Sequence, residues 1–274
     1  MPQHFDALME KSLSGSVARI WKGTCIAFCK NWRVFALLLV TCVVVMLPTV
    51  LIKGQVAGWL KGTLELGFEC ITLYVICSWA MRGHAEIAQK RLLRFALRFV
   101  VLKLLITLPA HLYFLFNLGD VIWTSRDMAA VSNGNVAIEQ SIIWARAMIT
   151  YPMAAFVYLL AFTWLPASLV SDGGGFLDAV KRGRVVLGHN LVWFIAGPFV
   201  LKLMFEFTSV GLAELGVSIL VALGGAGEGL YRLYLLFFVG AVWGAAKVLC
   251  VNTMIGIVIS RAYLIGEQRL KAPV

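Results

Sequence analysis

The stretch that decides the fold is LYLLFFVGAVWGAAKVLCVNTMIGIVI, residues 233–259, in which Lys247 is the one charged residue. A helix needs about 20 mostly apolar residues to cross the hydrocarbon core of a bilayer, and this stretch exceeds that length. The rest of the chain has the same character, with 61% hydrophobic residues, 14% charged residues and a mean hydropathy of +0.87. Soluble domains carry roughly 25% charged residues, so the sequence predicts an integral membrane protein.

Further apolar runs predict more crossings. Four of them are long enough to span directly, and another crossing must lie within 142–170, entering the hydrocarbon near Thr150. The apolar segment 211–223 is too short to span, so we interpret it as an outer re-entrant or interfacial segment. We expect a single all-α transmembrane domain over residues 1–274, with six spans at about 34–52, 62–81, 99–118, 150–170, 191–210 and 233–259.

The basic residues are distributed unevenly about these crossings. Six crossings place both termini on one side, and sixteen of the 24 Lys and Arg residues lie on that side, with five on the other and three in the spans. Cytoplasmic segments carry the excess of basic residues, so both termini are predicted to be cytoplasmic. The formal charge of +10 then reflects topology, and no nucleic-acid partner is expected.

Basic amphipathic segments precede the first, third and fifth crossings, at residues 1–33, 82–98 and 171–190. In the first segment, apolar residues at helical spacing lie opposite basic ones, which is typical of a helix lying in the membrane interface. Such helices suit anionic lipid headgroups. The expected headgroup contacts are Lys11, Arg19, Lys22, Arg91, Arg94, Lys181 and Arg182.

Ionisable residues within the spans are the main functional candidates. Each costs ~2.5–3.5 kcal/mol at a bilayer centre, so each needs a partner, a water-filled cavity or a role. Counting 1.5 Å per residue from the cytoplasmic helix ends places them roughly 18 to 26 Å deep. The predicted buried polar layer consists of Glu65, Glu69, His111, Lys202, Glu206 and Lys247.

Partners within this layer can be suggested from spacing. Glu65 and Glu69 are four residues apart and share a helix face, where their charges repel; Lys247 is the preferred cation for them. Lys202 and Glu206 share another face and could pair within their own helix. Lys103 lies close to its predicted helix end, so we expect it to snorkel to the interface.

Two interpretations of the layer stay open. It could be an electrostatic clasp that fixes helix register, or a site for an ion, a proton, a polar lipid or a solute. A second feature is a small-residue face on the last span, which allows a helix of this chain or of a partner subunit to approach closely. Its members are Gly240, Ala241, Gly244 and Ala245.

Catalytic motifs are missing from the sequence. It contains neither HExxH nor GxSxG, and its His and Cys residues do not show metal-ligand spacing. We therefore expect no enzymatic activity, no metal and no cofactor. The preferred function is a non-enzymatic accessory or scaffold subunit of a membrane complex, and the alternative is a transporter, channel or lipid-handling protein.

One segment resembles a known group of proteins. Residues 163–194, TWLPASLVSDGGGFLDAVKRGRVVLGHNLVWF, combine a helix ending in Leu-Val-x-Asp, an amphipathic segment with small and basic residues, and Asn190 before the next crossing. This pattern resembles a segment of bacterial six-helix inner-membrane proteins, among them the membrane domain attached to some glycerophosphodiester phosphodiesterases. The resemblance implies a bacterial cytoplasmic membrane and an accessory or lipid-linked role, and it carries over no catalytic residue.

Overall fold

The computed structural model describes residues 17–51, 55–81, 89–121, 148–150, 152–170, 174–209, 211 and 229–271. These residues are 94% helical and contain no strand, which confirms the all-α class. Three described stretches are long and apolar enough to cross a membrane: Gly62–Ala80, Leu187–Ser209 and Phe238–Lys271. A fourth results if the bent pair of helices near the N-terminus is counted as one span.

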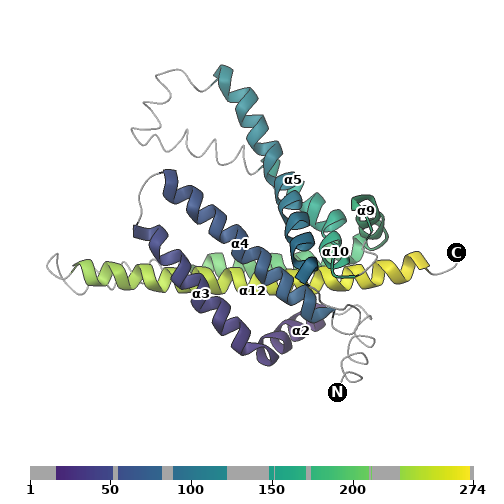
Figure 1. Ribbon diagram of the computed structural model, residues 1–274, viewed down its shortest axis with the longest axis horizontal. Coiled ribbons are helices and arrows are strands. Elements are labelled where there is room, and N and C mark those ends of the chain that lie inside the picture. The colour runs from purple at the N-terminus through teal and green to yellow at the C-terminus, as the bar shows by residue number, and fades with distance from the viewer. Residues whose placement is uncertain are drawn as a thin grey trace.

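Helix α12, Gly229–Lys271, is the axis of the molecule. Its 43 residues make it about 64 Å long at 1.5 Å per residue. It contacts α2, α3, α4, α9 and α10, which lie around it in Figure 1. The segment 252–263 is buried on every side because other helices enclose it, and its buried residues include the polar or charged Asn252, Thr253, Ser260 and Arg261.

Helices α2, Val17–Lys30, and α3, Trp32–Leu51, meet at 82°. Asn31 lies at the corner, and its side-chain Nδ2 donates a hydrogen bond of 3.0 Å to the Ala27 carbonyl at the end of α2. On α2, Ile20, Thr24 and Ala27 are spaced by four and three residues and are buried, so a single face of this helix packs on the protein. A separate helix therefore precedes α3 within the described part of the segment 1–33.

Helix α5, Gln89–Val121, is continuous through 33 residues. The basic segment predicted at 82–98 and the span predicted at 99–118 thus belong, from Gln89 onward, to one continuous helix, which contains Pro109. Helix α4, Gln55–Ala80, contacts both α3 and α5. Figure 1 shows α4 and α5 diverging from the C-terminal end of α4 and the N-terminal part of α5.

The predicted crossing 150–170 is broken in the structure. Helical residues pass into a π-helix, η2, Val157–Ala161, then into a turn and the four-residue helix α8, Trp164–Ala167. Helix α9, Phe176–Val185, folds back onto η2. Helix α10, Leu187–Phe194, leads into a second π-helix, η3, Ile195–Phe199, which contains Pro198.

Side chains from distant parts of the chain bind carbonyls of both π-helices. The Asn190 Nδ2 donates to the Leu159 carbonyl of η2 at 2.9 Å, and the Trp21 Nε1 donates to the Ala196 carbonyl of η3 at 3.1 Å. A π-turn disturbs the regular ladder of helical hydrogen bonds. The two contacts therefore satisfy backbone acceptors and connect segments 31 and 175 residues apart.

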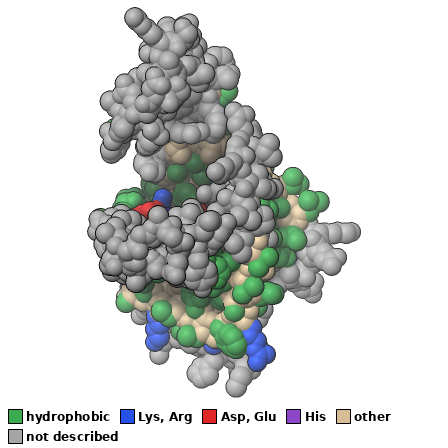
Figure 2. Space-filling view, turned by 90° about the vertical axis from the view of Figure 1, so that its left-hand side faces the viewer, with side chains coloured by type: hydrophobic (Ala, Val, Ile, Leu, Met, Phe, Trp, Pro, Cys, Tyr) green, Lys and Arg blue, Asp and Glu red, His purple; other side chains and the backbone are tan. Residues whose placement is uncertain are grey.

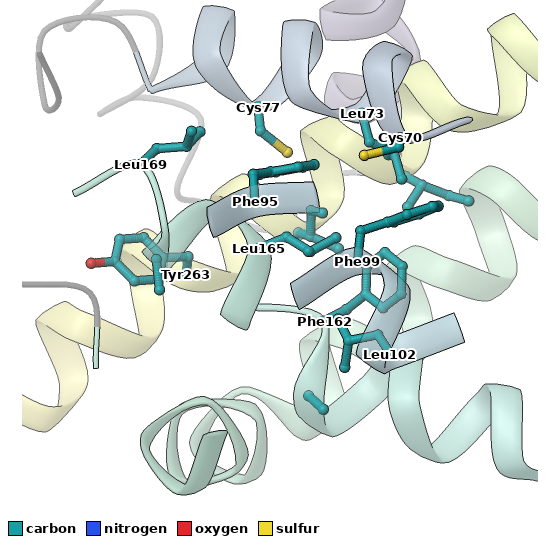
Figure 3. Close-up of a cluster of buried hydrophobic side chains, with 14 of the residues drawn as sticks. Cys70, Leu73, Cys77, Phe95, Phe99, Leu102, Phe162, Leu165, Leu169 and Tyr263 are labelled. Carbon is teal, nitrogen blue, oxygen red and sulfur yellow. The ribbon is translucent and has the colours of Figure 1, made fainter. Parts of the chain in front are cut away.

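The largest hydrophobic core lies where α4, α5, η2, α8 and α12 meet (Figure 3). Phe95, Phe99 and Leu102 of α5 are fully buried there. Two smaller clusters join α12 to α2, α3 and α4 on one side and to α2 and α10 on another. Because α12 contributes to all three clusters, it sets the relative positions of the helices that carry the candidate site.

Candidate functional site

The first mid-helix ion pair joins α4 to α5. The Lys103 ammonium contacts the Glu69 carboxylate, and about a quarter of each side chain is exposed, 24% and 27% respectively. Tyr158 of η2 lies within electrostatic range of both charges. Lys103 also lies over the ring of Phe99, with 5.4 Å between Nζ and the ring centroid. The sequence analysis suggested only snorkelling for Lys103, whereas the structure gives it a partner in Glu69.

The continuous helix α5 accounts for this contact. Depth was counted from Arg98, but α5 begins at Gln89, fourteen residues before Lys103. At 1.5 Å per residue that distance is about 21 Å. Glu69 was expected at a similar distance from the end of its own helix, which agrees with the contact between the two side chains.

The second pair joins α12 to the helical stretch Leu187–Ser209. Lys247 contacts the Glu206 carboxylate, and Lys202, one turn away on the same stretch, adds its positive charge to the surroundings of Glu206. Lys247 was expected to pair with Glu65 or Glu69. In the structure it contacts Glu206 instead, and Glu69 contacts Lys103. Nearby, the Trp243 Nε1 donates to the Ser209 Oγ at 2.9 Å, which holds the same two helices together.

The six predicted residues do not form one sealed layer. Glu65 and Lys202 are exposed, and the Glu206 side chain is 49% exposed. Figure 2, which views the molecule from the end where α12 begins, shows acidic and basic side chains close together in a recess. His111 lies on α5, but its side chain falls outside the described part of the structure.

The small-residue face of α12 divides into two parts. Ala245 is buried in a cluster with residues of α3 and α4. A Cβ added to Gly240 or Gly244 would meet nothing within 4 Å. Within the described residues, the two glycines therefore do not support close packing inside the chain.

Close approach occurs at other glycines. A Cβ at Gly183 of α9 would overlap the Leu160 carbonyl oxygen of η2 and lie 2.5 Å from the Leu160 Cα. A Cβ at Gly256 of α12 would lie 2.7 Å from the Ile76 Cγ2 of α4. The sequence does not distinguish these positions from other glycines, because their requirement comes from a neighbour far away in the chain.

The predicted headgroup contacts fall into three groups. Lys22, Arg94 and Lys181 are exposed, and Figure 2 shows basic side chains at the edge where α2 lies in Figure 1. The side chains of Lys11 and Arg19 lie outside the described residues. Arg91 donates to the Leu169 carbonyl at 2.6 Å, and Arg182 is only 3% exposed. The last two therefore bind the protein itself and do not belong to the exposed basic surface.

Arg98 forms a contact that the sequence did not suggest. Its guanidinium donates to the Trp164 carbonyl at 2.9 Å and to the Gly174 carbonyl at 3.4 Å, and it lies 5.0 Å from the Trp164 ring centroid. Burial, assisted by the positive charges of Arg94 and Arg182, lowers the pKa of Arg98 to about 10. Arg98 therefore stays protonated at neutral pH, and it fixes the segment between η2 and α9.

Neither a metal-binding arrangement nor a similarity to known proteins assigns a function to these contacts. Within the described residues, His, Cys, Asp and Glu side chains do not form a group of three that could hold a metal ion. Comparison of the chain with protein-family models, with curated proteins and with solved structures gave no significant match.

Proposed function

We propose that this chain is a six-span protein of a bacterial cytoplasmic membrane that acts as a non-enzymatic accessory or scaffold subunit of a membrane complex. In Figure 1 the C-terminal end of α4, the N-terminal part of α5, α9 and the C-terminal end of α12 lie toward one end of the molecule. The C-terminal end of α3 and the beginning of α4 and α12 lie toward the other. This arrangement agrees with helices that cross in alternating directions.

The observation that carries the proposal is the pairing of opposite charges on different helices. Lys103–Glu69 connects α4 with α5, and Lys247–Glu206 connects α12 with the stretch Leu187–Ser209. An unpaired charge at this depth would be costly, and each pair compensates both charges while fixing two helices in register. The pairs thus support an architectural role for the charged residues.

The free space beside Gly240 and Gly244 of α12 supports the proposal that a partner subunit binds there. Small residues let transmembrane helices approach closely, and Gly240 and Gly244 are not filled by the described part of this chain. A transmembrane helix of a partner would find backbone contact there. The exposed basic residues Lys22, Arg94 and Lys181 would in addition contact anionic lipid headgroups.

Gentle isolation from the source membrane, followed by mass spectrometry of attached proteins, tests this function. We expect a stoichiometric membrane partner with the wild-type chain and its loss with Gly244→Leu. The melting temperature of Gly244→Leu should stay near that of wild type, because a Cβ at this position meets nothing within 4 Å. Isolation of the wild type alone, or a partner retained by Gly244→Leu, would contradict the proposal.

Transport or lipid handling is the second candidate, and the partial exposure of the Lys247–Glu206 pair favours it. Charged groups that line a solute path must be accessible to the solute, and about half of the Glu206 side chain is exposed. This function predicts that one solute or lipid copurifies with the wild type and is lost in Glu206→Gln. If Glu206→Gln retains everything that the wild type carries, the pair is architectural.

A further inference from the structure

Arg182 is a buried arginine held in a fixed orientation. It lies on α9 and is 3% exposed. Its Nη1 donates to the Glu267 Oε1 at 2.8 Å, and its guanidinium carbon lies 5.0 Å from the Tyr263 ring centroid. At Gly266 of α12, an added Cβ would lie 3.1 Å from the Arg182 Cβ. Tyr263, Gly266 and Glu267 lie within about one turn of α12, and together they restrain the Arg182 side chain.

Two donors of the same guanidinium are left over. The Nε and Nη2 of Arg182 are enclosed and have no hydrogen-bond partner. An enclosed donor without an acceptor costs about 1–3 kcal/mol, and more when the group is charged. These two nitrogens form one edge of the planar guanidinium, and that edge matches two oxygens of a carboxylate or phosphate group in a bidentate contact.

The surroundings of this edge are positively charged. The charges of Arg182 and Arg94 both act on Arg98, and Arg98 and Arg182 both act on Tyr263. Among the described residues, the acidic residue that contacts Arg182 is Glu267. The Glu267 carboxylate also forms an ion pair with the Lys271 ammonium, with 3.6 Å between Nζ and Oε2. One carboxylate thus serves two cations, and the local excess of positive charge favours an anion.

We propose that the Nε–Nη2 edge of Arg182 binds one oxyanion of the phosphate type, at the junction of α9 with the C-terminal part of α12. The oxygens of the anion accept both leftover donors, and Glu267 holds the third. A phospholipid headgroup and free phosphate present the same oxygens. The lipid source rests on the cytoplasmic-side location proposed above, whereas anion binding itself does not depend on a partner subunit.

Enclosure of the donors also predicts how the anion binds. Entry requires α9 and α12 to separate, so exchange should be slow and a bound anion should stabilise the contact between these helices. The effect is therefore measurable as a rise in melting temperature.

Arg182→Lys and Arg184→Lys form a matched pair for the test. Both keep the positive charge on α9, but lysine lacks the planar edge, and Arg184 is exposed. The detergent-washed proteins are titrated separately with inorganic phosphate and with a short-chain phosphatidylglycerol, and the melting temperature is recorded. We expect stabilisation of the wild type and of Arg184→Lys, and a midpoint shifted at least about tenfold toward higher concentration in Arg182→Lys.

The two ligands distinguish the source of the anion. Stabilisation by inorganic phosphate indicates a free oxyanion, and stabilisation by the lipid alone indicates a headgroup; either supports the site. No stabilisation of the wild type by either ligand, or equal midpoints for both variants, would overturn it.

Glu267→Gln keeps the test decisive if Arg182→Lys does not fold. This change removes the internal carboxylate, so more positive charge faces the anion, and the stabilisation by phosphate should exceed that of the wild type. Unchanged or weaker stabilisation in a folded Glu267→Gln protein would show that Arg182 serves Glu267 alone. Loss of a partner protein is not involved in either readout, so failure here is distinct from failure of the scaffold role.

Discussion

At the scale of single residues, the structure depends on positions where backbone meets backbone. Gly183 lies against Leu160 in the π-helix η2, and Asn190 donates to the next carbonyl back, that of Leu159. Gly183 thus lets α9 lie directly on the backbone of η2, and the Asn190 side-chain amide provides a hydrogen-bond donor for one of the η2 carbonyls. Both residues belong to the segment that connects η2 to η3.

Gly183→Ala should lower the stability of the folded protein. The new methyl group would overlap the Leu160 backbone, which cannot move as a side-chain end can, and overpacking of this kind costs about 1–3 kcal/mol or more. Gly188→Ala is the control, because a Cβ there meets nothing within 4 Å and alanine favours the helix. Thermal unfolding in detergent compares the two. Equal melting temperatures would show that α9 does not lie tightly on η2.

At the scale of elements, the helices are joined by side chains that sequence spacing assigned to other partners. Lys103 was placed near the interface because Arg98 was taken as the beginning of the span. In fact α5 continues from Gln89, and Arg98 is used to hold Trp164 and Gly174. Apolar length and basic residues predict that a helix exists, but they do not show where one helix lies relative to its neighbour.

A double-mutant cycle on Lys103 and Glu69 measures the connection between α4 and α5. Lys103→Met leaves the Glu69 carboxylate unpaired and should destabilise by about 2 kcal/mol, less than a fully buried pair because a quarter of each side chain is exposed. Glu69→Gln alone should cost a similar amount. The double variant should be more stable than the sum of the two losses predicts. Simple additivity would mean that the two charges do not interact.

At the scale of the whole molecule, the all-α class could be predicted because hydrophobicity and length alone decide it. The sequence also located helices at the expected spans, although the one at 150–170 is broken and α12 extends well beyond Ile259. The polar layer was predicted less well. The ionisable residues could be recognised, whereas their pairing into Lys103–Glu69 and Lys247–Glu206 depends on helix offsets that appear only in three dimensions.

The six-span topology with cytoplasmic termini is the central claim, since the depth of the ion pairs and the lipid contacts follow from it. Single-cysteine variants at Arg126, in a predicted outer loop, and at Arg269, near the end of α12, test it directly in a background lacking the native cysteines. A membrane-impermeant thiol reagent should label Arg126→Cys in intact cells and Arg269→Cys only after the membrane is opened. Labelling of Arg269→Cys in intact cells, or protection of Arg126→Cys, would contradict the account.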